Sequence, residues 1–162
     1  MLGRGLVATL AGMAAVAALT SCTVAPDPPD FGYRMEGGVL VVVFPRCPSE
    51  SVTGAAVLVS RSGQGNFEYL WRAKEPARRD VEEGRFSVGD STSFGEVGQP
   101  LREALPEEFD VKVTYVDAGG REKERDGVVR QGALKGVRLR GGEYMTWPGK
   151  VMTRQQIDAQ RK

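Results

Sequence analysis

The sequence contains no histidine among its 162 residues. This absence removes Ser-His and Cys-His nucleophilic pairs, zinc sites built on imidazole, and the most common general base near neutral pH. Two cysteines are too few for a zinc site made of cysteines alone. No phosphate-binding loop is present, because "GQG" at 63–65 is a turn without the rest of that motif. We therefore expect no catalytic residues, no cofactor and no metal site, in a protein that is not an enzyme.

Carboxylates are the remaining candidates for chemistry. The adjacent glutamates at 82–83 and at 107–108 would point to opposite faces of a strand, so neither pair could act on one substrate. The segment "DAGGREKERDG" at 117–127 offers acidic calcium ligands, but Arg and Lys residues alternate with them and would repel the ion. These carboxylates are better explained as solvated loop charges.

A surplus of charge of either sign is also missing. The chain has 22 basic and 21 acidic residues, which gives a formal net charge of +1. A nearly neutral protein has no broad positive field that would attract nucleic acid. We therefore expect no nucleic-acid partner.

The amino-terminal segment has the parts of a secretory signal. Met1 to Arg4 form a short basic start, and residues 5–19, "GLVATLAGMAAVAAL", are almost wholly apolar. This run is shorter than the roughly 20 apolar residues that cross a bilayer, and it is dominated by alanine. A cleaved signal peptide therefore fits better than the alternative, a retained membrane helix.

The apolar run ends in "LTSC", Leu19 to Cys22. This sequence resembles the lipobox of bacterial lipoproteins, which consists of a leucine, two small residues and an invariant cysteine. The resemblance implies that residues 1–21 are removed, that Cys22 carries a diacylglycerol, and that the protein is held at the outer face of the cytoplasmic membrane. Two or three acyl chains give durable anchoring, which a single chain does not.

Residues 22–36 are expected to form a tether, because Pro, Asp and Gly are frequent there and three prolines fall within 26–29. The folded domain is then expected to begin near Gly37. If Cys22 carries lipid, the chain has no second cysteine for an intramolecular disulfide with Cys47. We then expect Cys47 to be a buried small side chain, with intermolecular pairing as the alternative.

Short strands are predicted across residues 37–150. Apolar β-branched runs indicate strands at 38–44 and 53–60, and alternation at 67–72 would place Phe67, Tyr69 and Trp71 on one face. "FDVKVTYVD" at 109–117 alternates most clearly, as a half-buried antiparallel strand does.

Turns and one helix complete the predicted elements. Glycine-rich turns are predicted at 118–120 and at "DG", 126–127. The last residues, 151–162, are expected to form a tail or a short helix in which Thr153 caps the start and Gln156 completes a capping box.

This pattern predicts an all-β fold, an antiparallel β-sandwich. "ALPEEFDVKVTYVDAGG" resembles the corner and following strand of fibronectin type III and immunoglobulin-like domains, with Phe109 where those domains usually have Tyr. The resemblance implies an immunoglobulin-like sandwich over residues 37–150. "VVVFPRCP", followed by a second strand and an "LW" strand, also resembles small actinobacterial lipoproteins, and this resemblance implies no known activity.

Two aromatic residues are the only binding candidates. Tyr144 and Trp147 lie in "GGEYMTWPGK", between glycines and proline, and could form an exposed platform for a sugar ring or a partner loop. The alternative is that they close one end of the sandwich. We expect a lipid-anchored, extracytoplasmic interaction or structural module of the cell envelope, whose partner is an envelope protein. A module that binds a glycan or a small solute is the alternative.

Overall fold

The computed structural model describes residues 29–60, 66–147 and 149–161. The expected signal peptide of residues 1–21 and the lipidation site Cys22 lie outside these ranges. All the strands and helices below belong to the described ranges.

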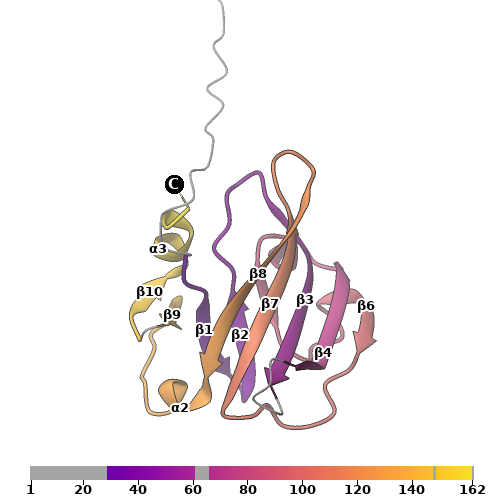
Figure 1. Cartoon of the computed structure of the whole chain (residues 1–162). Helices are drawn as coiled ribbons and strands as arrows, with labels where there is room; N and C mark the ends of the chain where they lie inside the picture. Colours follow the sequence, from indigo (N-terminus) through magenta and orange to yellow (C-terminus); the bar gives the residue numbers. More distant parts are fainter. Residues whose placement is uncertain (1–28, 61–65, 148, 162) are drawn as a thin grey trace, which may run out of the picture.

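Two five-stranded sheets form the molecule, and every neighbouring pair of strands is antiparallel (Figure 1). The first sheet has the order β10 (Val151–Thr153), β9 (Glu143–Thr146), β1 (Gly32–Glu36), β2 (Val39–Val43) and β5 (Arg85–Ser87). The second sheet has the order β6 (Phe94–Gln99), β4 (Phe67–Pro76), β3 (Ser51–Ser60), β7 (Glu108–Val116) and β8 (Glu122–Arg130). Three short helices connect or end these strands: α1 (Arg79–Glu82), α2 (Gln131–Leu134) and α3 (Arg154–Ala159).

The main core lies between the two sheets. Trp71 of β4 in the second sheet is fully buried and stacks on Phe86 of β5 in the first, with ring centroids 6.3 Å apart. Alternate residues of β7, including Val111 and Val113, enter the same core, as the alternation predicted. The predicted all-β sandwich is therefore confirmed.

The chain passes back and forth between the two sheets: β1 and β2 lie in the first, β3 and β4 in the second, β5 in the first, β6 to β8 in the second, and β9 and β10 in the first. The alternating segment predicted at 109–117 corresponds to β7, between β3 and β8. At the edges, β6 pairs with β4, and β9 and β10 continue the first sheet beyond β1.

One prediction about β4 is wrong. Phe67 is exposed and Tyr69 half-buried, whereas Trp71 is fully buried, so the three side chains do not share one face. The cause is a β-bulge: Val57 pairs with Trp71 but Leu58 pairs with Tyr69, so Leu70 is an extra residue. An extra residue reverses the alternation on either side of it.

The turn predicted at 126–127 is also wrong, because both residues lie inside β8. A Cβ atom built on Gly127 would lie 2.3 Å from the hydroxyl oxygen of Tyr33 and 2.9 Å from the Phe31 ring. Glycine is therefore present because the strand passes very close to two core side chains. The turn at 118–120 is confirmed, since Asp117 and Arg121 close it with a backbone hydrogen bond.

We expect Gly127→Ala to lower the free energy of unfolding by about 1–3 kcal/mol, because the methyl group overpacks the core. Tyr33→Phe removes the nearest atom, the hydroxyl oxygen, which is buried without a hydrogen-bond partner among the described residues. The double variant should therefore lose less stability than Gly127→Ala alone. Urea unfolding of the three variants measures this, and equal losses in both backgrounds would contradict the proposed contact.

The domain extends beyond the boundaries expected at residues 37 and 150. At the amino-terminal end, Phe31 and Tyr33 are buried in the main core, so residues 31–36 are not a tether. At the carboxyl-terminal end, α3 covers the outer face of the first sheet, where Ile157 packs with Val41, Val43 and Tyr144 in a second apolar cluster. The sandwich therefore includes α3.

The capping box predicted for α3 is confirmed. The Thr153 hydroxyl accepts a hydrogen bond from the Gln156 amide, and the Gln156 side chain accepts one from the Thr153 amide. These bonds satisfy two of the amides that a helix start leaves without partners.

Candidate functional site

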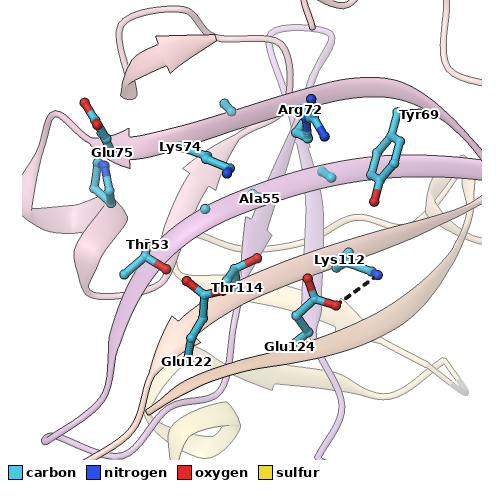
Figure 2. A pocket seen from close by; sticks show the side chains of 14 residues that line it. Thr53, Ala55, Tyr69, Arg72, Lys74, Glu75, Lys112, Thr114, Glu122 and Glu124 are labelled. Carbon is cyan, nitrogen blue, oxygen red and sulfur yellow. Dashed lines mark hydrogen bonds and ion pairs between the residues drawn. The ribbon is translucent and has the colours of Figure 1, made fainter. Parts of the chain in front are cut away.

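A trough lies on the outer face of the second sheet (Figure 2). Its volume is about 400 Å³. Its floor is β3, where Gly54 and Ala56 face away from the core while Val57 and Val59 face into it. The stretch of β3 that lines the trough thus has only small side chains, and the longer side chains of its neighbours form the walls.

The wall on the β4 side is basic. Arg72 lies directly beside Ala56, and Lys74 lies directly beside Gly54. The guanidinium carbon of Arg72 lies 5.2 Å from the centre of the Tyr69 ring. At this distance the cation and the face of the ring attract each other in a cation–π interaction. Neither cation forms an ion pair with a residue in the described ranges. Among the described residues no carboxylate forms an ion pair with this wall, although Glu96 of β6 is the cross-strand neighbour of Lys74.

The opposite wall is formed by β7 and β8. Lys112 flanks Ala56 on this side, and Thr114 flanks Gly54. The ammonium group of Lys112 donates a hydrogen bond to Glu124 at 3.1 Å, and this bond raises the pKa of Lys112. Lys112 therefore stays charged near neutral pH, although Glu124 offsets its charge.

Two carboxylates close one end of the trough. Glu75 follows Lys74 on β4, and Glu122 begins β8; Figure 2 shows both at the end away from Tyr69. Glu75 has a backbone φ of +57°, a left-handed conformation that is strained in a residue with a side chain. The trough is therefore basic along β4 and acidic at this end.

The two aromatic candidates do not form a common platform. Tyr144 is buried in the apolar cluster under α3, with 5% of its surface exposed. Trp147 has 43% of its surface exposed, and the guanidinium of Arg130 lies over its ring at 4.3 Å. Beside Trp147 is a crevice of only about 70 Å³, far smaller than a typical ligand site.

The adjacent glutamates hold surface contacts. Glu107 pairs with Lys135 and Glu108 pairs with Arg130. Glu83 pairs with Arg79 one helical turn away. In the hairpin at 117–121, backbone and side-chain hydrogen bonds from Arg121 lower the pKa of Asp117. Each of these acids therefore has a structural role.

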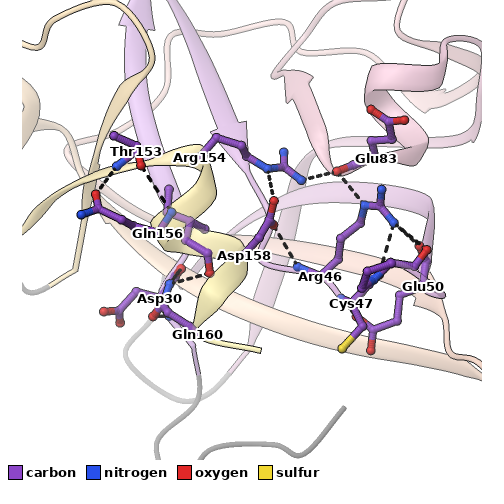
Figure 3. A network of polar contacts seen from close by, with 12 residues as sticks. Asp30, Arg46, Cys47, Glu50, Glu83, Thr153, Arg154, Gln156, Asp158 and Gln160 are labelled. Atoms are coloured by element: carbon purple, nitrogen blue, oxygen red, sulfur yellow. Dashed lines mark hydrogen bonds and ion pairs between the residues drawn. The ribbon is translucent and has the colours of Figure 1, made fainter. Parts of the chain in front are cut away.

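A polar network joins α3 to the loop between β2 and β3 (Figure 3). Arg46 donates to the carbonyl oxygens of Glu83 and Glu50, at 2.9 and 2.7 Å, and Asp158 of α3 accepts from the Arg46 amide at 3.4 Å. Glu50 is buried, and its carboxylate accepts from the Cys47 amide at 2.9 Å and pairs with the buried Arg161. This network fixes the carboxyl-terminal segment against the sandwich.

Cys47 lies inside this network with 2% of its surface exposed, so its predicted burial is confirmed. Its state differs from the expected lone thiol, because Cys47 is disulfide-bonded. The sequence contains one other cysteine, Cys22, which lies outside the described residues. A cysteine that carries a thioether-linked lipid cannot also form a disulfide, so the expected lipidation of Cys22 would exclude an intramolecular disulfide between Cys22 and Cys47.

The described ranges contain no group of three or more metal-binding side chains placed to hold an ion. No helix in them has the length and apolar character needed to span a membrane. Comparisons with protein-family models, with curated proteins and with solved structures each found no match.

The trough residues were missed in the sequence because they come from four strands. The signal that could have found them is the alternation of small residues, Gly54 and Ala56, with the core residues of β3. Small side chains on the outer face of a central strand leave room for a ligand. The charged residues of the walls could not be assigned without the pairing of the strands.

Proposed function

We propose that this protein is a lipid-anchored, extracytoplasmic binding module of a bacterial cell envelope, and that it is not an enzyme. The observation that carries the proposal is the Leu19–Cys22 motif at the end of the apolar run of residues 5–19. The sandwich adds support, because it presents a trough of about 400 Å³, within the size range of ligand sites. The trough also contains no histidine or cysteine that could act as a nucleophile or base.

An envelope protein is the partner that fits this module best. The trough lies open along the strands of a sheet and is lined by charged and hydroxyl side chains, as protein-binding surfaces often are at their rims. The glycan alternative relied on paired aromatic rings, and here only Trp147 is exposed. We therefore favour a protein partner over a glycan.

The anchor is tested by intact mass of the full chain extracted from bacterial membranes, beside Cys22→Ala and Cys47→Ala variants. We expect the native chain and Cys47→Ala to lack residues 1–21 and to carry added acyl mass. Cys22→Ala should be uncut and unmodified. An uncut native amino terminus, or equal masses of native and Cys22→Ala after allowing for the substitution, would contradict the proposal.

The same sample reports the state of Cys47. In the lipidated form the one remaining thiol should react with iodoacetamide after unfolding without a reductant, because Cys47 is buried in the folded chain. If Cys47 is instead in a disulfide, it should react with iodoacetamide only after reduction.

A further inference from the structure

Two cations of the trough, Arg72 and Lys74, form no ion pair among the described residues and stand at a fixed spacing on β4. Arg72 and Lys74 are two positions apart on β4, so their side chains leave the same face about 6.6 Å apart at roughly 3.3 Å per residue. Any other extended peptide repeats its side chains at the same interval. Two acidic side chains at alternate positions of an extended segment therefore match Arg72 and Lys74 one to one.

We propose that the trough binds an acidic peptide segment in extended conformation, with carboxylates at alternate positions that pair with Arg72 and Lys74. The inference rests on the proposed function, since it names the kind of partner that the module recognises. The segment would belong to an envelope protein and would lie along β3, between the walls.

The floor allows this approach. Gly54 and Ala56 each lie between a β4 cation and a β7 residue, so a carboxylate above the floor meets a positive group on at least one side. A Cβ built on Gly54 would already lie 3.2 Å from the Ala73 carbonyl oxygen, which shows how little room a larger residue would have at this position. Small residues therefore keep the space between the walls open.

The acidic end limits the length of the recognised segment. Glu75 and Glu122 stand beyond Lys74, so a third carboxylate placed there would meet like charge. The other end, near Arg72, is bounded by the ring of Tyr69. The site thus fits two alternating acids better than a long polyanion.

The test uses fluorescein-labelled peptides and the full chain in non-ionic detergent at low salt, with fluorescence anisotropy as the readout. The acidic peptide is Gly-Glu-Val-Glu-Val-Gly. One control, Gly-Gln-Val-Gln-Val-Gly, removes its charge, and another, Gly-Glu-Glu-Val-Val-Gly, keeps the charge but changes the spacing. We expect the acidic alternating peptide to bind more tightly than both controls, and increasingly weakly as salt is added.

Two variants of the trough and one matched control locate the site. Arg72→Gln with Lys74→Gln should weaken binding about 2- to 30-fold, the range for two exposed ion pairs. Ala56→Leu keeps every charge but fills the floor and should also weaken binding, with native-like thermal unfolding as the check on folding. Arg138→Gln with Lys150→Gln removes two exposed charges elsewhere and should leave binding unchanged.

Three results of the direct binding experiments would overturn the inference. They are equal affinity for the acidic and the Gln peptides, an equal loss in the Arg138/Lys150 control, and no binding of the acidic peptide to the native chain. Stronger competition by dextran sulfate than by the unlabelled acidic peptide would also overturn it, in favour of a polyanionic glycan. The anchor experiment does not depend on Arg72 or Lys74, so acyl mass on Cys22 with a negative peptide result would reject the inference alone.

Discussion

Glu50→Gln is expected to lower the free energy of unfolding by about 3–5 kcal/mol, the cost of leaving a buried charge without its partner. The substitution keeps the size of the side chain but removes its charge. Glu50 and Arg161 are 7% and 5% exposed, so water cannot replace the lost contact. The measurement is urea unfolding of the full chain in non-ionic detergent.

A second cation near Glu50 increases the expected cost. The guanidinium of Arg125 lies over the rings of Phe44 and Tyr115, at 5.3 and 5.8 Å. Burial, and next the charge of Arg161, lower the pKa of Arg125. Glu50→Gln would remove one negative charge that offsets the repulsion between Arg125 and Arg161.

The matched control is Glu83→Gln, which breaks the exposed pair with Arg79 on α1. The Arg79 side chain is 88% exposed, so this loss should be under about 1 kcal/mol. Replacing both partners of the buried pair, as Glu50→Gln with Arg161→Met, should cost less than the sum of the single changes. A loss at Glu50 no larger than at Glu83 would show that α3 and the β2–β3 loop are not joined as described.

Features that depend on local sequence could be predicted. The alternation that buries Val111 and Val113 on β7 follows from the two-residue period of a strand. The start of α3 follows from the reciprocal hydrogen bonds of Thr153 and Gln156, which need only four consecutive residues. The sandwich itself followed from the number of such short strands and the turns between them.

Features that depend on contacts between distant segments could not be predicted. The dipeptide that contains Gly127 has the sequence of a turn. Glycine is required there because Phe31 and Tyr33, almost a hundred positions earlier in the chain, pack closely against the strand. The bulge at Leu70 became visible only from the pairing of β4 with β3. Proline and glycine near Gly32 indicated a tether, yet β1 begins there because its neighbours β2 and β9 supply hydrogen bonds.

The candidate site could not be predicted for the same reason, because it depends on contacts between distant segments. Arg72, Lys74 and Lys112 are ordinary exposed charges in the sequence, and they acquire a common location only because β4 and β7 pair with opposite sides of β3. Trp147 was found from its loop composition and is exposed, but its supposed companion Tyr144 is needed to pack α3. Residue type alone did not distinguish these two roles.

Ile157→Ala is expected to lower the free energy of unfolding by about 2–5 kcal/mol, as other large-to-small core changes do. Ile157 is fully buried between α3 and the first sheet, where it meets Tyr144, Val41 and Val43. A residue in a detached tail would contribute almost nothing. Urea unfolding of the variant therefore measures whether residues after Val151 belong to the folded domain.

Two further variants identify the contact. Gln155→Ala, on the exposed side of α3, should change stability by no more than about 0.5 kcal/mol. Gly32→Ala should be destabilising, because its Cβ would lie 2.4 Å from the Cδ1 atom of Ile157. Its cost should fall when Ile157 is already alanine, because the clashing atom is gone; an unchanged cost would mean that α3 does not rest on β1.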